Sequence, residues 1–244
     1  MRPILFQWHG ITVWSYPAML YLGMVAGVAA GNLSAHGSGL DAFRVYIAML
    51  ILFIPALLGA KLLYVLTHWP LYREDPTRIW KRPDGGAAQY GGLVVVLVCS
   101  VPLLAALHLP FGAFWDVAIF TILVLMIFGR VGCLMNGCCA GRQSQSWLGV
   151  HLPNRSGEWT KRLPTQVLEA GWAALLLIVA MVARRPTLFP GALFLLVVAG
   201  YAAGRLVLES TREETKIGQV TIHHWISALL ITVSVGLLLA RWPR

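Results

Sequence analysis

The stretch FTILVLMIFGRVGCLMNGCCAG, residues 120–141, decides the fold class of this chain. Its first ten residues carry no charge, and an arginine and three cysteines follow directly. A bilayer core about 30 Å thick needs roughly 20 apolar residues per helix. The stretch therefore predicts a membrane-spanning helix that carries an arginine, Arg130, near one end. An ionisable residue inside a membrane is costly, so Arg130 is a candidate functional residue.

The whole chain has the composition of a membrane protein. Of its 244 residues, 58% are hydrophobic and 12% are charged, whereas an average soluble domain is about 25% charged. We therefore expect an all-α, polytopic membrane protein of about seven helices that forms a single domain over residues 1–244. The seven expected helices are 16–33, 42–66, 91–107, 116–135, 166–183, 191–210 and 222–239.

Seven helices place the long loops on the side of the membrane that holds the N-terminus. These loops, 67–90, 136–165 and 211–221, are expected to form a small cap. The cap side carries eleven Lys and Arg residues and the opposite side five, so the positive-inside rule would place the cap in the cytoplasm. The net charge of +9 suits anionic lipid headgroups. No nucleic-acid-binding motif is present, so we expect membrane lipids and no nucleic acid as partners.

Two arginines are expected at the same depth in the membrane. Arg130 lies fourteen residues after Asp116, and Arg205 fourteen residues after Gly191, where their helices enter from the side opposite the cap. At 1.5 Å per residue each lies about 21 Å along its helix. Roughly 9 Å then remain to the cap-side surface of the hydrocarbon core. Further polar residues fall in the same half: Tyr16, Lys61, Tyr90, Glu169, Glu209 and Arg212.

This polar half predicts a cationic pocket that binds an anion at the level of the lipid headgroups. Arginine suits phosphate because its planar fork stays charged and donates two hydrogen bonds. A phospholipid headgroup is the obvious anion at that depth. The alternative is snorkelling, in which long basic side chains reach the nearby interface. Arg205 and Glu209, four residues apart, could also form a structural ion pair on one helix face.

The four cysteines allow several interpretations. Cys99 falls in an apolar helix and is expected to pack as a small hydrophobic residue. Cys133, Cys138 and Cys139 form a C-x4-C-C pattern without a nearby fourth ligand, so no metal is expected. A redox role is possible, because a thiol beside Arg130 would have a lowered pKa. A packing role and a vicinal disulfide between Cys138 and Cys139 are the other possibilities.

Four ordered segments resemble signature segments of the bacterial prolipoprotein diacylglyceryl transferase family. GRVGCLMNGCCAG (129–141) is similar to G-R-x-G-N-F-x-N-G-E-x-x-G, and QYGGLV (89–94) to H-G-G-L. RLPTQVLEA (162–170) resembles H-P-S/T-Q-x-x-E, and GYAAGRLVLESTR (200–212) resembles G-x-x-R-x-x-x-E-x-x-R. WSYPAMLYLG (14–23) and GAKLLYVL (59–66) also fit, so the resemblance spans nearly the whole chain.

The resemblance implies an enzyme of the bacterial inner membrane, with its N-terminus and long loops in the periplasm and its C-terminus in the cytoplasm. This orientation opposes the charge count, and we follow the resemblance. The implied reaction moves the diacylglyceryl group of phosphatidylglycerol to the lipobox cysteine of a preprolipoprotein. It forms a thioether, releases glycerol phosphate and needs no cofactor or metal.

The resemblance also implies roles for individual residues. Arg130 and Arg205 take the positions of the family's arginines and would clamp the phosphodiester as negative charge builds on it. Tyr90 stands where the family has its histidine. These three residues are the expected catalytic residues. The expected substrate-binding residues are Tyr16, Lys61, Gly91, Gly92, Asn136, Gly141, Gln166, Glu169, Glu209 and Arg212.

The signature segment also departs from the family pattern. Cys133 replaces an asparagine and Cys138 a glutamate. A paralogue with a different acceptor is therefore one alternative. A membrane thiol-disulfide oxidoreductase that uses the three clustered cysteines is another, although it would leave the two arginines at equal depth without a purpose. An anion or lipid transporter is the third, although the half of the membrane opposite the cap has no polar path.

Overall fold

The computed structural model describes residues 4–9, 11–80, 88–154, 157–184, 189–213 and 222–241. Contacts within the chain divide it into two compact units. One comprises Met1–Ser34 with Trp115–Arg244, and the other comprises Ala35–Phe114. The parts of the expected cap loops at 81–87, 155–156 and 214–221 lie outside the described residues.

All seven expected helices are present. They are α1 (Ser15–His36), α2 (Ala42–Thr67), α4 (Gln89–Ala106), α5 (Phe111–Asn136), α6 (Thr165–Ala183), α7 (Ala192–Glu209) and α8 (Ile222–Ala240). Six are long and apolar enough to cross a membrane, and α4 is a shorter apolar helix. The prediction of a polytopic all-α membrane protein is therefore confirmed, with the start of α5 five residues earlier than expected and the other helix ends shifted by three residues or fewer.

Short elements outside the seven long helices were not predicted. They are the antiparallel hairpins β1 (Ile4–Trp8) with β2 (Ile11–Trp14) and β3 (Val150–Pro153) with β4 (Trp159–Arg162), the short helix α3 (Trp69–Arg73) and the 3-10 helix η1 (Pro76–Trp80). The strands have four or five residues each. Such short strands leave no clear alternation in the sequence, so hydrophobic periodicity does not reveal them.

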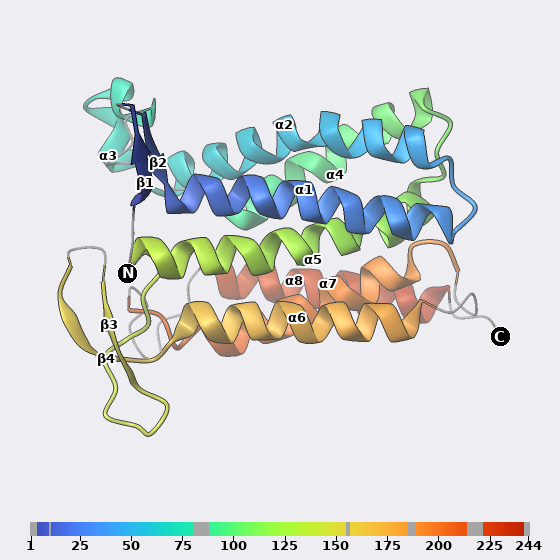
Figure 1. Ribbon diagram of the computed structural model, residues 1–244. Helices are drawn as coiled ribbons and strands as arrows, with labels where there is room; N and C mark the ends of the chain where they lie inside the picture. Colours follow the sequence, from blue (N-terminus) through green and yellow to red (C-terminus); the bar gives the residue numbers. More distant parts are fainter. Residues whose placement is uncertain are drawn as a thin grey trace. The chain divides into compact units, whose positions relative to one another are not determined.

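In the first unit, α1, α5, α6, α7 and α8 lie side by side, and the β3–β4 hairpin lies at the end where α5 ends and α6 begins (Figure 1). Glycines allow close approach between the helices. A Cβ at Gly27 would lie 2.7 Å from the carbonyl oxygen of Thr121. The Thr121 hydroxyl donates to the Gly27 carbonyl at 2.9 Å. Where α6 meets α7, Trp172 Nε1 donates to the Gly200 carbonyl at 3.2 Å.

Asp116, near the start of α5, caps the N-terminus of α7. Its carboxylate accepts hydrogen bonds from the backbone N–H of Gly191 at 2.6 Å and of Phe194 at 2.9 Å. The first backbone N–H groups of a helix have no partner within the helix, so a carboxylate at this position stabilises it. The contact sets the axial position of α7 against α5. Arg130 lies fourteen residues after Asp116, and Arg205 lies fourteen residues after Gly191.

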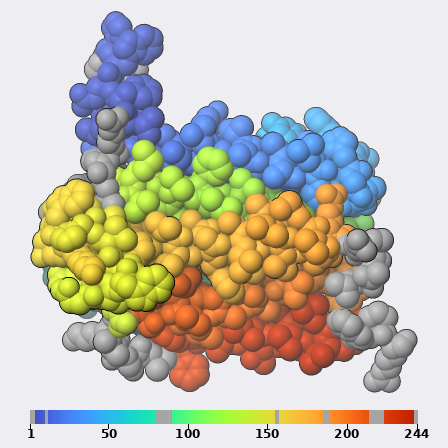
Figure 2. All heavy atoms as spheres, turned by 60° about the horizontal axis from the view of Figure 1, so that its bottom comes forward, coloured from blue at the N-terminus to red at the C-terminus, as the bar shows by residue number. Residues whose placement is uncertain are grey.

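The β3–β4 hairpin and its flanking loop form a lobe at one end of α6 (Figure 2). Backbone hydrogen bonds join this loop to the start of α6 and the end of α7. Arg142 N donates to Thr211 O at 2.8 Å, and Leu163 N donates to Arg142 O at 3.0 Å. The fully buried Arg162 anchors the lobe, because its Nη1 lies 2.6 Å from Glu213 Oε1. The lobe is the part of the expected cap that the structure describes.

In the second unit, α2 and α4 pack closely through small residues. A Cβ at Gly91 would collide with the backbone of Gly59, and one at Gly92 would lie 2.8 Å from the Ala56 carbonyl oxygen. Ala88 N, just before α4, donates to the Ala60 carbonyl at 2.9 Å. Because both glycines of the QYGGLV segment are needed for this approach, the structure gives them a packing role.

Candidate active site

A buried network of three arginines and two glutamates lies in the first unit, where α5, α6 and α7 meet. Glu169, in the first turns of α6, is its centre. Arg130 Nε lies 2.6 Å from Glu169 Oε2, and Arg212 Nη2 lies 2.9 Å from Glu169 Oε1. Arg205 Nη1 also donates to Glu169 Oε1. One carboxylate therefore binds three guanidinium groups from residues on or next to two other helices.

Glu209 adds a second carboxylate at the end of α7. Arg205 Nη2 lies 2.7 Å from Glu209 Oε2, which confirms the expected ion pair on one helix face. Arg212 Nε lies 3.7 Å from the same oxygen. This nitrogen is buried and has no hydrogen-bond partner among the described residues.

The snorkelling interpretation is wrong for both arginines inside the helices. Arg130 is 8% exposed and Arg205 is 6% exposed, and each is held by a carboxylate within the bundle. A buried guanidinium needs such a partner because desolvation of an isolated charge is very costly. Ion pairing between helices, rather than reach toward the interface, accounts for their positions.

The network has an excess of one positive charge, because it combines three arginines with two glutamates. One phosphodiester, which carries a single negative charge, would neutralise it. Arg212, just outside the helices, keeps its charge. Burial opposes that charge, but the carboxylate of Glu169 outweighs burial and raises the pKa of the Arg212 guanidinium. The charge of a monoanionic phosphate ester would therefore match the excess charge of this buried network.

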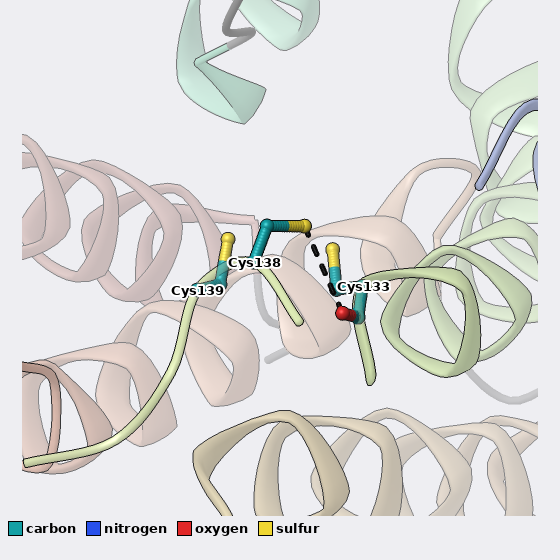
Figure 3. Close-up of side chains that lie close together, drawn as sticks. All are labelled: Cys133, Cys138 and Cys139. Carbon is teal, nitrogen blue, oxygen red and sulfur yellow. Dashed lines mark hydrogen bonds between the residues drawn. The ribbon is translucent and has the colours of Figure 1, made fainter. Parts of the chain in front are cut away.

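The three cysteines of the signature segment form a cluster beside this network. Their sulfur atoms all lie within 4.8 Å of one another. Figure 3 shows the three side chains close together, with Cys133 near the end of α5 and Cys138 and Cys139 on the loop that follows. Cys138 Sγ lies 3.8 Å from the Cys133 carbonyl oxygen. Hydrogen bonds with the other two thiols, together with the charges of Arg130 and Arg212, lower the pKa of the Cys139 thiol although burial opposes this. All three are free thiols.

Other expected site residues hold this loop in place. Gln166 is 2% exposed, and its Nε2 donates to the Cys138 carbonyl at 2.8 Å. Asn136 is the last residue of α5, and its side chain lies beside Cys138. Gly141 forms a β-bridge with Arg212, and a Cβ there would collide with the Leu163 carbonyl oxygen. Tyr16, at the start of α1, is close enough to the cysteines and to Arg130 to interact electrostatically.

The remaining expected site residues belong to the second unit. Tyr90 is the second residue of α4 and is 4% exposed. Lys61 Nζ on α2 lies 5.8 Å from the ring centres of both Tyr64 and Tyr72, which is cation–π geometry. Gly91 and Gly92 pack α4 against α2. The catalytic and substrate-binding roles of these residues stay predictions.

Two contributors to the site were not found from the sequence. Asp116 was noted only as the start of a helix, and its capping of α7 joins residues 75 positions apart in the chain. Arg162 was counted only as a basic loop residue, and it is an anchor of the cap. No local pattern marks either residue, because each acts through a distant partner.

The fold and this site together define a class of protein. It is a polytopic membrane protein with a buried, net cationic ion-pair network at one end of its helix bundle. That arrangement suits an enzyme that acts on an anionic lipid.

Comparison with known sequences identifies the family. The chain belongs to the prolipoprotein diacylglyceryl transferase family, whose sequence pattern matches residues 3–240. It is 28% identical to a phosphatidylglycerol–prolipoprotein diacylglyceryl transferase of Listeria innocua serovar 6a, over 99% of this chain and 90% of the relative. It is 27% identical to one of Streptococcus pyogenes serotype M5, over 99% of this chain and 95% of the relative. The resemblance inferred from the four segments is confirmed.

Proposed function

We propose that this chain transfers the diacylglyceryl group from phosphatidylglycerol to the lipobox cysteine thiol of preprolipoproteins. The products are a thioether-linked diacylglyceryl group and glycerol phosphate. Membership of the transferase family supports the reaction. The observation that carries the assignment to this site is the Glu169-centred network, which has one excess positive charge and includes Arg130 and Arg205.

The network fits the chemistry that such a transfer requires. The acceptor sulfur attacks the glycerol carbon that bears the phosphate, and the carbon–oxygen bond to phosphate breaks. Negative charge grows on the departing phosphate, where Arg130, Arg205 and Arg212 can stabilise it with charge-assisted hydrogen bonds. These groups are already held in position by Glu169 and Glu209, so little reorganisation is needed during the reaction. Gln166 and Asn136 hold the neighbouring loop.

We also propose a location and an orientation. The enzyme lies in the bacterial inner membrane with its N-terminus and cap in the periplasm and its C-terminus in the cytoplasm. The family supports this orientation, and the basic residues of the cap side are weak topology signals where they build an anion site or anchor a lobe, as Arg212 and Arg162 do. A thiol reagent that does not cross membranes should label a cysteine placed at the exposed Trp147 in intact spheroplasts.

The reaction is tested by a transfer assay with purified protein in detergent. The protein is mixed with phosphatidylglycerol and a lipobox peptide, and the mass of the peptide is followed. We expect a gain of one diacylglyceryl group. Arg130→Ala and Arg205→Ala should each reduce the rate by at least about 10²–10³-fold, the effect typical of losing a preorganised donor to a developing anion.

A matched control is Arg44→Ala. Arg44 pairs with Asp41 at 3.3 Å, but its side chain is 49% exposed, so the variant should keep the parent rate. Full activity in Arg130→Ala or Arg205→Ala would exclude the phosphate clamp. No mass gain with any lipobox peptide, beside an active relative, would indicate the paralogue with a different acceptor.

The thiol-disulfide oxidoreductase alternative has no support from the relatives or from the described residues. It predicts that quinone reduction and not lipid transfer depends on Cys138. A parent protein that shows no quinone reduction, together with a Cys138→Ser variant that loses lipid transfer, would exclude it.

A further inference from the structure

The three-cysteine cluster has the dimensions of a metal site. Its sulfur atoms lie within 4.8 Å of one another. Three thiolates on a tetrahedral zinc ion at about 2.3 Å are about 3.8 Å apart. Rotation of the three short side chains that shortens the sulfur–sulfur distances by about 1 Å is therefore enough to form the zinc site. The sequence spacing alone argued against a metal, but the loop after α5 brings the sulfurs together (Figure 3).

The backbone of this loop is bent in an uncommon way that places the sulfurs. Gly137 has φ +72° and Cys139 has φ +57°. The left-handed region suits glycine but is disfavoured for a residue with a Cβ. Cys138 N closes the turn by donating to the Cys133 carbonyl at 3.1 Å. Unfavourable backbone conformations of this kind persist mainly at functional sites.

We propose that Cys133, Cys138 and Cys139 bind one Zn²⁺ ion and leave its fourth coordination position open for the thiol of the acceptor cysteine. The inference rests on the proposed function, because it assigns the ion a role in the transfer. Among the described residues, no His, Asp, Glu or further Cys joins the three sulfurs within the ligand cluster. Three protein ligands with one open position are typical of catalytic zinc, whereas structural sites have four.

The nearby arginines favour such a complex. Three thiolates and one Zn²⁺ carry a net charge of −1, and Arg130 and Arg212 act electrostatically on Cys139. The net negative complex would therefore interact favourably with the net positive Glu169-centred network. Soft thiolate ligands select zinc or Cu(I) over the hard cations Mg²⁺ and Ca²⁺.

The ion would activate the acceptor. When the lipobox thiol binds zinc, its S–H proton is released to water, because a coordinated thiol is deprotonated. The thiolate then attacks the glycerol carbon, so that a sulfur–carbon bond forms and the carbon–oxygen bond to phosphate breaks. The electron pair of that bond leaves with glycerol phosphate, next to the arginines. The product thioether is a weaker ligand and leaves the ion, and no group is oxidised or reduced.

Metal binding is tested on the full chain in detergent. Protein purified from zinc-supplemented cells should contain one zinc per chain by elemental analysis. Titration of the metal-free protein with Cd²⁺ should give thiolate-to-metal charge-transfer absorbance that saturates at one ion. Cys138→Ser and Cys139→Ser should lose the ion. The matched control Cys99→Ser removes a thiol from α4, outside the cluster, and should retain it.

Cys138→His tests coordination against a disulfide or simple packing. Histidine ligates zinc but forms no disulfide, so this variant should bind zinc and recover at least a tenth of the transfer rate that Cys138→Ser loses. Circular dichroism shows whether each variant is folded. A zinc content of the folded parent, after supplementation, that is no higher than that of Cys138→Ser would overturn the proposal. So would a Cys138–Cys139 disulfide in active enzyme.

Transfer activity separates this inference from the proposed function. Chelation should abolish transfer, and added Zn²⁺ should restore it. Bound zinc whose removal leaves the rate unchanged would overturn the activating role while the transferase assignment stands. Stoichiometric zinc in a protein that transfers no diacylglyceryl group would refute the proposed function and the role of the ion in it, and would leave only the metal site.

Discussion

Arg130 Nε and Glu169 Oε2 lie 2.6 Å apart, although the two residues come from different helices and both side chains are more than nine-tenths buried. The same carboxylate also binds Arg205 and Arg212. Glu169 therefore holds together a cluster of like charges that would otherwise repel one another. The stability of the ion-pair network depends on Glu169 as much as on the arginines.

Glu169→Gln should destabilise the protein and abolish transfer. The neutral amide leaves buried guanidinium groups uncompensated, and breaking a buried ion pair costs about 3–5 kcal/mol. Thermal unfolding in detergent measures the stability, and the lipobox peptide assay measures the rate.

Glu158→Gln is the matched control for that substitution. Glu158 also pairs with an arginine, Arg162, at 3.6 Å, but its side chain is 59% exposed. Arg162 is fully buried but keeps its 2.6 Å contact with Glu213, so removal of the exposed Glu158 carboxylate should cost about 1 kcal/mol or less. Equal effects of the two variants would show that Glu169 has no special place in the network.

Asp116→Ala should destabilise α7 and reduce transfer. Two backbone N–H groups at the start of that helix lose their acceptor, and loss of a helix cap costs about 0.5–2 kcal/mol. Arg205 would then be held less firmly at the depth of Arg130. Asp116→Asn keeps one acceptor oxygen and should show a smaller loss of both melting temperature and transfer rate. A melting temperature for Asp116→Ala equal to that of the parent would rule out the capping role.

Gly91→Ala should lower stability by about 1–3 kcal/mol, as expected when extra volume is forced into a close contact. The added Cβ would collide with the backbone of Gly59. Gly171→Ala is the control, because a Cβ at that position in α6 meets nothing within 4 Å. Alanine there should be neutral or stabilising by up to about 1 kcal/mol. If Gly91→Ala were fully stable but inactive, Gly91 would be a substrate contact and not a packing residue.

Tyr90→Phe should retain the fold and reduce the transfer rate about tenfold or more. The ring that is buried in α4 is kept, and only the hydroxyl is removed. A hydrogen bond to a charged group contributes about 1.5–3 kcal/mol, and 1.4 kcal/mol corresponds to a factor of ten. The rate at saturating lipid is the appropriate measurement. An unchanged rate would remove Tyr90 from the catalytic residues.

The helices could be predicted almost entirely from the sequence. The expected segment 166–183 corresponds to α6 at Thr165–Ala183, and the expected segment 42–66 to α2 at Ala42–Thr67. Long apolar runs suffice because backbone groups in a bilayer must be satisfied within the helix. The four strands were missed because each is short and lies in a polar or aromatic loop.

The site was predicted in part. Arg205 and Glu209 could be paired from their spacing on one helix, and the pair is present. The shared use of Glu169 could not be predicted, because it joins residues from α5, α6 and the end of α7. The proximity of the three cysteine sulfurs could not be predicted for a related reason, since spacing along the chain does not show how a loop with two left-handed residues folds back.

The sequence by itself determined the class of protein, the number of long helices and the equal spacing of Arg130 from Asp116 and of Arg205 from Gly191 along the chain. The constant rise of a helix converts residue number into distance along its axis. Only the tertiary structure decided which side chains meet across helices, such as Arg130 with Glu169, and that three sulfurs converge. Those contacts depend on the rotation of each helix about its axis and on the path of its loops, which are set by packing between distant segments.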